Sequence, residues 1–250
     1  MTAPNQVRGS GRRRLAIVLL IVLVAAVAGG GYGLWYLFLR PSGPAAVGSG
    51  SLSLPASVSS SPLPAGGLDG TWNVDTSIGS SSDSTDSFVG YRVQEQLASI
   101  GANTAVGRTP NVSGTLTIAG TKLTASSITA DLTALQSDDQ RRDGQLQDHG
   151  LETGTFPNAT FSLTAPIDLG ADPTNGQEID VTATGQLTLH GQTKTVEIPL
   201  KARLAGSIIE VVGSLPITFS DYGIVKPSSF EVLSVADKGT LELQLFFDHA

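Results

Sequence analysis

The sequence predicts an all-β domain of antiparallel strands, preceded by a transmembrane helix and a linker. Three observations carry this prediction: a 25-residue uncharged apolar run near the N-terminus, a Pro/Ser/Gly-rich stretch after it, and apolar residues at every second position from residue 69 onward. Eight or more such strands in about 180 residues predict a closed barrel or a sandwich.

The apolar run Leu15–Leu39 would form a helix about 37 Å long, which spans a bilayer. Four arginines precede the run and only Arg40 follows it, so the positive-inside rule places the N-terminus in the cytoplasm. We therefore expect residues 1–14 to be a basic cytoplasmic tail, residues 15–39 a signal anchor, and the rest extracytoplasmic. The alternative is secretion after signal cleavage, because Ala26-Val27-Ala28 fits an A-x-A site. The apolar run continues to Leu39, which favours the anchor.

Residues 40–68 are predicted to be a linker. Pro41–Leu68 has no charge and no aromatic residue, and it is rich in Pro, Ser and Gly. In the flexible regime its root-mean-square span is about 30 Å, which would leave the following domain free to tilt.

Residues 69–250 are predicted to form the barrel domain. The hairpin Gly185–Leu200 turns at His190-Gly191 and has one apolar face, which meets either the protein's core or a guest molecule. Further turns are expected at Ala119-Gly120, Asn175-Gly176 and Ala205-Gly206. The other expected strands are 71–75, 88–94, 114–118, 161–169, 179–189, 209–219 and 241–247.

One segment departs from the period of two. Ser137–Leu146 predicts a short helix, with Ser137 as N-cap, Gln140 at the capping-box position and two aspartates in the first turn. A single helix in an all-β domain suits a plug or lid at one end of a barrel.

Composition excludes several functions. The absence of cysteine removes disulfides, thiolate metal sites and cysteine nucleophiles. Residues 69–250 carry ten Lys or Arg against twenty-two Asp or Glu, and this net charge of −12 disfavours nucleic acid and anionic lipid headgroups as partners.

No catalytic motif is present, and we predict neither an enzyme nor a metal site. His190 is assigned to its turn, His149 to a loop, and His249 to a frayed C-terminus. Arg141-Arg142-Asp143 has two interpretations: a helix end paired with nearby strand residues, or an arginine that points toward the barrel mouth to meet a polar headgroup.

Five stretches in order resemble the motifs of the YceI-like family of exported bacterial proteins: AVGRTPNVSGTLTI (105–118), RRDGQL (141–146), TFPNATFSL (155–163), GQLTLHGQTKTVEIPL (185–200) and FSDYGI (219–224). The resemblance covers about residues 70–248. It implies a closed antiparallel lipocalin-like barrel whose interior holds a polyisoprenoid or similar amphiphile, such as an isoprenoid quinone.

The resemblance also implies site residues. It places Val89, Tyr91 and Val93 on the inward face of the second strand, and Arg142-Asp143 as the family's Arg-Asp pair on the helix. The chain departs from the family at Gln145, where members often have His, and at HGLETG (149–154), where an aromatic pair follows in other members. The remaining ligand-binding candidates are Phe161, Leu163, Ala183, Gly185, Leu187, Val211, Ile217 and Tyr222.

Three functions follow as hypotheses. The first is a membrane-anchored barrel that binds an isoprenoid lipid for storage, transport or envelope stress protection, with Ala183 and Gly185 leaving space for the guest. The second is a packed structural or protein-interaction domain of the cell envelope. The third, an enzyme acting on isoprenoid lipids, is disfavoured because no nucleophile, base and orienting group stand at recognisable spacing. The sequence does not define the oligomeric state.

Overall fold

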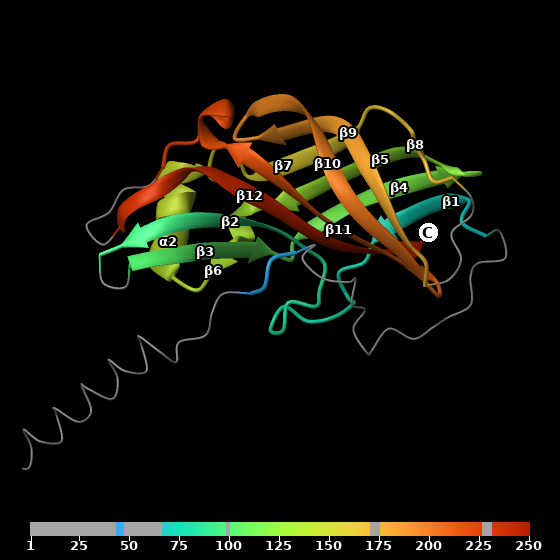
Figure 1. Ribbon diagram of the computed structural model, residues 1–250, viewed down its shortest axis with the longest axis horizontal. Helices are drawn as coiled ribbons and strands as arrows, with labels where there is room; N and C mark the ends of the chain where they lie inside the picture. Colours follow the sequence, from blue (N-terminus) through green and yellow to red (C-terminus); the bar gives the residue numbers. More distant parts are fainter. Residues whose placement is uncertain (1–43, 48–66, 99–100, 171–175, 227–231) are drawn as a thin grey trace, which may run out of the picture. The chain divides into compact units, whose positions relative to one another are not determined.

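The structure, a computed structural model, describes residues 44–47, 67–98, 101–170, 176–226 and 232–250 (Figure 1). The described residues belong to one compact unit, Gly43–Ala250. The predicted tail and anchor, most of the predicted linker, and Asn175 of an expected turn lie outside them. Within the described part of the chain, no helix is both long and apolar enough to cross a membrane.

The described strands form one twelve-stranded antiparallel sheet with eight positions around a barrel. Four positions are each shared by two strands that are consecutive in the sequence. These pairs are β1 (Gly70–Val74) with β2 (Phe88–Leu97), β3 (Gly101–Thr109) with β4 (Val112–Ala119), β5 (Lys122–Asp131) with β6 (Gln136–Ser137), and β7 (Asn158–Leu163) with β8 (Ile167–Asp168). The other four are single strands: β9 (Glu178–Leu189), β10 (Gln192–Ala205), β11 (Ile208–Thr218) and β12 (Val232–His249).

The sheet closes on itself between its first and last strands. Trp72 of β1 is paired with His249 of β12, and Val74 is paired with Phe247. This closure confirms the barrel prediction and shows that the alternative of a sandwich is wrong. Because each barrel position neighbours the one before it in sequence, the arrangement is an up-and-down barrel.

The C-terminal strand is ordered to its end. His249 lies in β12, its ring meets the Trp72 ring edge to face at 5.0 Å, and its Nε2 lies 3.1 Å from the Asp69 carbonyl oxygen. The expectation of a frayed His249 is therefore wrong, because strand pairing and the Trp72 contact hold it.

The β9–β10 hairpin confirms its sequence pattern. Leu189 pairs with Gln192, and the two turn residues His190 and Gly191 have φ of +50° and +70°, as a type I′ turn requires. The apolar residues Leu187, Leu189 and Ile198 are buried on one face of the hairpin.

The observed helix begins later in the sequence than predicted. Helix α2 is Gln140–Gln145, and its N-cap is Asp139, whose carboxylate accepts from the Arg141 amide at 2.9 Å. Ser137 is not the cap, because it lies in β6 and its hydroxyl donates to Asp143 at 2.6 Å.

Two other expectations are corrected. A π-helix, η3 (Leu146–Gly150), follows α2 and contains His149, which the sequence had placed in a loop. The expected strand 161–169 is interrupted between β7 and β8, where Pro166 lacks the amide that a continuous strand would need.

The helical segments gather at one end of the barrel, where Figure 1 shows α2. The 3-10 helices η2 (Leu132–Ala134) and η4 (Phe219–Tyr222) contribute buried residues to an apolar cluster there. We call this the cap cluster; its buried members are Leu132, Leu135, Leu187, Leu189, Ile217 and Tyr222. The cap cluster packs at this end of the interior.

Substitution of Trp72 tests how much the β1–β12 closure contributes to stability. Its side chain is fully buried and its Nε1 donates to the Leu68 carbonyl at 3.0 Å. We expect Trp72→Ala to lower the free energy of unfolding by about 3–5 kcal/mol, through lost burial and a cavity at the closing strand. Trp72→Phe, which keeps a ring but loses the hydrogen bond, should cost about 1–2 kcal/mol.

Urea unfolding followed by circular dichroism measures both changes. If Trp72→Ala unfolds within 1 kcal/mol of the wild type, about the size of one hydrogen bond, the β1–β12 closure does not carry the stability assigned to it.

Candidate binding cavity

The barrel interior contains an apolar cavity of about 170 Å³. That volume is about ten times what admits a single water molecule. Its lining comes from strands around the barrel and consists mainly of aliphatic and aromatic side chains. With few polar groups to hold water, such a space favours a hydrocarbon guest over solvent.

The polar residues at the cavity are few. Ser126, Thr160 and Gln177 are among them. Arg203 and Glu242 also border the cavity, but strand alternation directs their side chains to the outer wall. The last two side chains are engaged in ion pairs: Arg203 pairs with Glu210 at 2.7 Å and Glu242 with Arg92 at 2.9 Å. The charge in the lining is therefore already partnered within the protein.

Half of the sequence-predicted site residues share this cavity. The structure brings together six of them, from β2, β7, β9 and β11: Val89, Phe161, Leu163, Ala183, Leu187 and Val211. Ala183 is 3% exposed, and its small side chain leaves free volume at the middle of β9.

Gly185 lies on the inward face of β9, as predicted, but it does not provide space for a guest. A Cβ at this position would lie 2.4 Å from two ring carbons of Phe161 and 2.5 Å from the Ser162 carbonyl oxygen. The missing side chain therefore accommodates the Phe161 ring rather than a guest.

The remaining predicted residues lie elsewhere. Ile217 and Tyr222 belong to the cap cluster, and Tyr91 packs against it. A Cβ at Gly239 would come within 3.0 Å of both Val93 and the Phe219 ring, which places Val93 beside η4. None of these four lines the cavity, and neither does Arg142.

Several lining residues were not among the candidates. Inward residues of β4, β5 and β12 line the cavity but were not predicted to do so. Those of β12 could have been found from the alternation of apolar residues along 241–247. Leu68 had no such signal, because it was assigned to the linker. The missed residues include Leu68, Leu116, Ile118, Leu123, Ile128, Ile209, Leu241, Leu243, Leu245 and Phe247.

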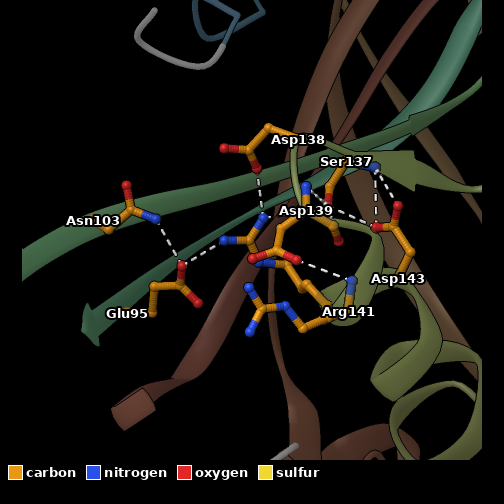
Figure 2. A network of polar contacts seen from close by, with 8 residues as sticks. Glu95, Asn103, Ser137, Asp138, Asp139, Arg141 and Asp143 are labelled. Carbon is orange, nitrogen blue, oxygen red and sulfur yellow. Dashed lines mark hydrogen bonds and ion pairs between the residues drawn. The ribbon is translucent and has the colours of Figure 1, made fainter. Parts of the chain in front are cut away.

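Arg142 joins the helix to the strands. Its Nη2 pairs with Glu95 of β2 at 2.8 Å and its Nη1 with Asp138 at 2.5 Å. Figure 2 shows the surrounding network, in which Asn103 donates to Glu95 at 2.6 Å and Ser137 to Asp143. The Arg-Asp pair thus fixes α2 against β2, β3 and β6.

Tyr91 places a buried hydroxyl beneath this network. Its oxygen has no hydrogen-bond partner among the described residues. Burial raises the pKa of the Tyr91 phenol above its ordinary 10.0, and the nearby positive charge of Arg142 opposes this only in part.

His190 connects three segments at the same end. Its Nδ1 lies 3.0 Å from the Tyr222 carbonyl oxygen, its Nε2 lies 2.9 Å from Glu152, and its ring meets Phe156 at 4.6 Å. This histidine therefore has a structural role at the turn. No cluster of three metal-ligating side chains occurs in the described part of the chain.

An up-and-down barrel of eight positions with an apolar interior defines the class of small barrels that can enclose one ligand. The family model of the YceI-like domain matches residues 81–247, most of the described barrel. The chain belongs to the YceI-like family.

Solved structures share the fold. A polyisoprenoid binding domain from Saccharophagus degradans is 20% identical, with a TM-score of 0.55, and the match covers 72% of this chain and 98% of that one. BcnA from Burkholderia cenocepacia is 24% identical, with a TM-score of 0.50 and coverage of 64% and 95%. No curated protein matches the sequence.

Tyr91 predicts a pH dependence. Because its folded pKa is raised, the folded state keeps a proton that the unfolded chain releases near pH 10, so this contribution to stability is complete below about pH 10 and is lost as pH rises further. We expect Tyr91→Phe to flatten the fall in stability, measured as the urea midpoint between about pH 8 and 11.

Tyr222→Phe is the matched control. Burial, then the charge of Asp221, also raises the pKa of the Tyr222 phenol, but this shift is smaller than the one at Tyr91, so removal of the Tyr222 hydroxyl should flatten the profile less. An unchanged profile in Tyr91→Phe would contradict the assignment.

Proposed function

We propose that the barrel binds the hydrocarbon chain of an amphiphilic isoprenoid lipid, such as a polyisoprenoid or an isoprenoid quinone, in its interior. The observation that carries this proposal is the apolar cavity of about 170 Å³. Protein interiors normally contain few voids larger than a water molecule, so a space of this size is unusual for a packed core. A guest chain would supply the missing van der Waals contacts.

The extent of the lining favours a long guest. Along β9 it runs from Ile179 to Leu187, and these eight residue steps of strand span about 26 Å. A flexible hydrocarbon chain suits such a space better than a compact ring system does.

The two ends of the barrel suggest an orientation for the guest. The cap cluster lies at the helical end, whereas the cavity reaches Leu68, Leu169 and Gln177 at the opposite end. We place the polar headgroup of the lipid at this helix-free end, where it keeps contact with water and avoids the cost of burial.

The similar domain from Saccharophagus degradans, described as polyisoprenoid binding, supports the choice of ligand. We further propose that residues 15–39 anchor the protein and that the barrel is extracytoplasmic, because of the arginine asymmetry around the apolar run. Storage, transport and protection of the envelope under stress are roles consistent with such a protein.

Binding rather than catalysis is proposed. The described cavity lining offers the hydroxyls of Ser126 and Thr160 but no histidine beside them, and its two charged residues are held in ion pairs. A nucleophile with an oriented base is therefore not assembled on the described cavity wall.

Ala183→Trp tests the cavity. The indole should enter space that the guest occupies, so co-purified lipid should be lost while the lipid-free domain unfolds within about 1 kcal/mol of the wild type. Thr182→Trp, one residue away on the exposed outer face, is the matched control and should retain lipid.

The measurements are mass spectrometry of solvent extracts and urea unfolding of delipidated protein. Delipidated samples are needed because bound ligand stabilises the wild type by mass action. A wild type without lipid, together with strong destabilisation by Ala183→Trp, would instead support the packed structural domain.

The anchor predicts fractionation behaviour. Full-length protein should remain with membranes after a high-salt wash, because salt screens charge but does not weaken hydrophobic insertion. Deletion of residues 15–39 should move the barrel to the soluble fraction. A mature N-terminus at Gly29 would instead establish the cleaved signal peptide.

A further inference from the structure

A short segment that precedes the barrel lies against its outer wall. Pro44–Val47, blue in Figure 1, contacts β2, β3 and β12 through its main chain. Arg92 donates to the Pro44 carbonyl at 2.7 Å, Arg108 donates to the Ala45 carbonyl at 3.2 Å, and the Val47 amide donates to Glu242 at 3.3 Å.

The wall beneath this segment carries three charges in close contact. Glu242 lies 2.9 Å from Arg92 and 3.7 Å from Arg108, and its side chain is only 2% exposed. The two arginine side chains are 18% and 14% exposed. Buried charges are costly unless their hydrogen-bonding groups are satisfied, so this cluster requires partners beyond its own ion pairs.

The balance of donors and acceptors identifies those partners. Two guanidinium groups offer ten N–H donors, more than the roughly four lone-pair sites of one carboxylate can accept. The carbonyl groups of Pro44 and Ala45 accept part of this excess, while the Val47 amide uses the carboxylate. The cluster is thus complementary to main-chain groups, since it binds two carbonyls and one amide of the segment.

Arg108 is held in place for this contact. Its guanidinium lies 3.9 Å from the centroid of the Phe88 ring, and Phe88 is 1% exposed. Packing on the ring fixes the direction of the donors before the segment binds. Burial lowers the pKa of the Arg108 guanidinium, and Glu242 opposes this change.

The cluster contacts the main chain of Pro44–Val47 rather than its side chains. Pro44, Ala45 and Ala46 are exposed, and their small side chains let the backbone approach the wall. The compact unit that contains the barrel begins at Gly43, rather than at the first strand.

We propose that Pro44–Val47 is a strap that binds the Arg92–Glu242–Arg108 cluster and holds the barrel close to its membrane anchor. The strap itself stands on the described contacts; its consequence for the membrane rests on the proposed anchor. Only residues 40–43 then separate the predicted span from the strap, and five residue steps reach at most about 18 Å. A free linker of 28 residues has a root-mean-square span of about 30 Å.

The test measures the distance between the strap and the barrel in the full-length chain in lipid nanodiscs. The chain has no cysteine, so Ala46→Cys and Lys194→Cys give two unique spin-label positions, both at exposed residues. We expect a single narrow distance distribution by pulsed electron paramagnetic resonance. If the strap is released, the distance distribution should broaden to roughly 25 Å, the span of a flexible chain of about 20 residues.

Val47→Pro and Val47→Ala form the decisive pair. Proline removes the amide that donates to Glu242, whereas alanine retains it. Residue 47 is not part of any barrel strand, so neither substitution alters a strand residue. We expect the broad distribution in Val47→Pro and the narrow one in Val47→Ala. Arg92→Gln should also broaden it, with Lys201→Gln, a cation in an exposed pair on β10, as the control.

Each other outcome overturns the proposal. A broad distribution in the otherwise unaltered chain, or a narrow one in Val47→Pro, means that the segment is not held by these contacts. A narrow distance that disappears on dilution with unlabelled protein means that the strap binds a second copy instead of its own barrel. Salt-washed membranes test the anchor separately, so a soluble protein with a narrow distance refutes the anchor and leaves the strap intact.

Discussion

The pairing of β1 with β12 is the constraint on which the rest of the structure depends. Without it the sheet would have two edges, and its inward residues would face solvent rather than one another. Closure places every inward side chain on a common interior, with Trp72 and Phe247 among the buried residues beside the joint. The apolar cavity exists because this interior is not completely filled by the residues that line it.

The two faces of β12 show how one strand serves two surfaces. Leu241, Leu243 and Leu245 line the cavity, whereas Glu242 lies between them in the sequence and meets two arginines and the strap. The outer wall is therefore not a plain solvent-exposed face at this position. A buried ion cluster and a main-chain contact lie on the opposite side of the same strand from the candidate lipid site.

Sequence reasoning identified the barrel because alternation and turn chemistry are local properties. The hairpin at His190-Gly191 is an example, since its turn and both strands are encoded within sixteen residues. β3 and β5 were missed because Thr, Ser, Ala and Gly occupy many of their positions and weaken the alternation. The helix cap was misplaced by two residues because Ser137 is drawn into pairing with β3, a nonlocal contact. For the cavity, parity located Ala183 and Leu187, but it could not show that the Phe161 ring takes the space at Gly185.

The place of β12 as the last strand of the described barrel governs how the barrel can fold. This strand pairs with β11, β1 and β2, so these three strands remain incompletely paired until the eighteen residues of β12 are available. Joining residues near 72 and 249 also requires a loop of nearly the whole domain to close, and such long-range pairing is slow. During synthesis the unfinished sheet would therefore expose edges that can pair with other chains. Closure of the barrel therefore waits for β12, and the apolar interior forms only when this strand is available to pair.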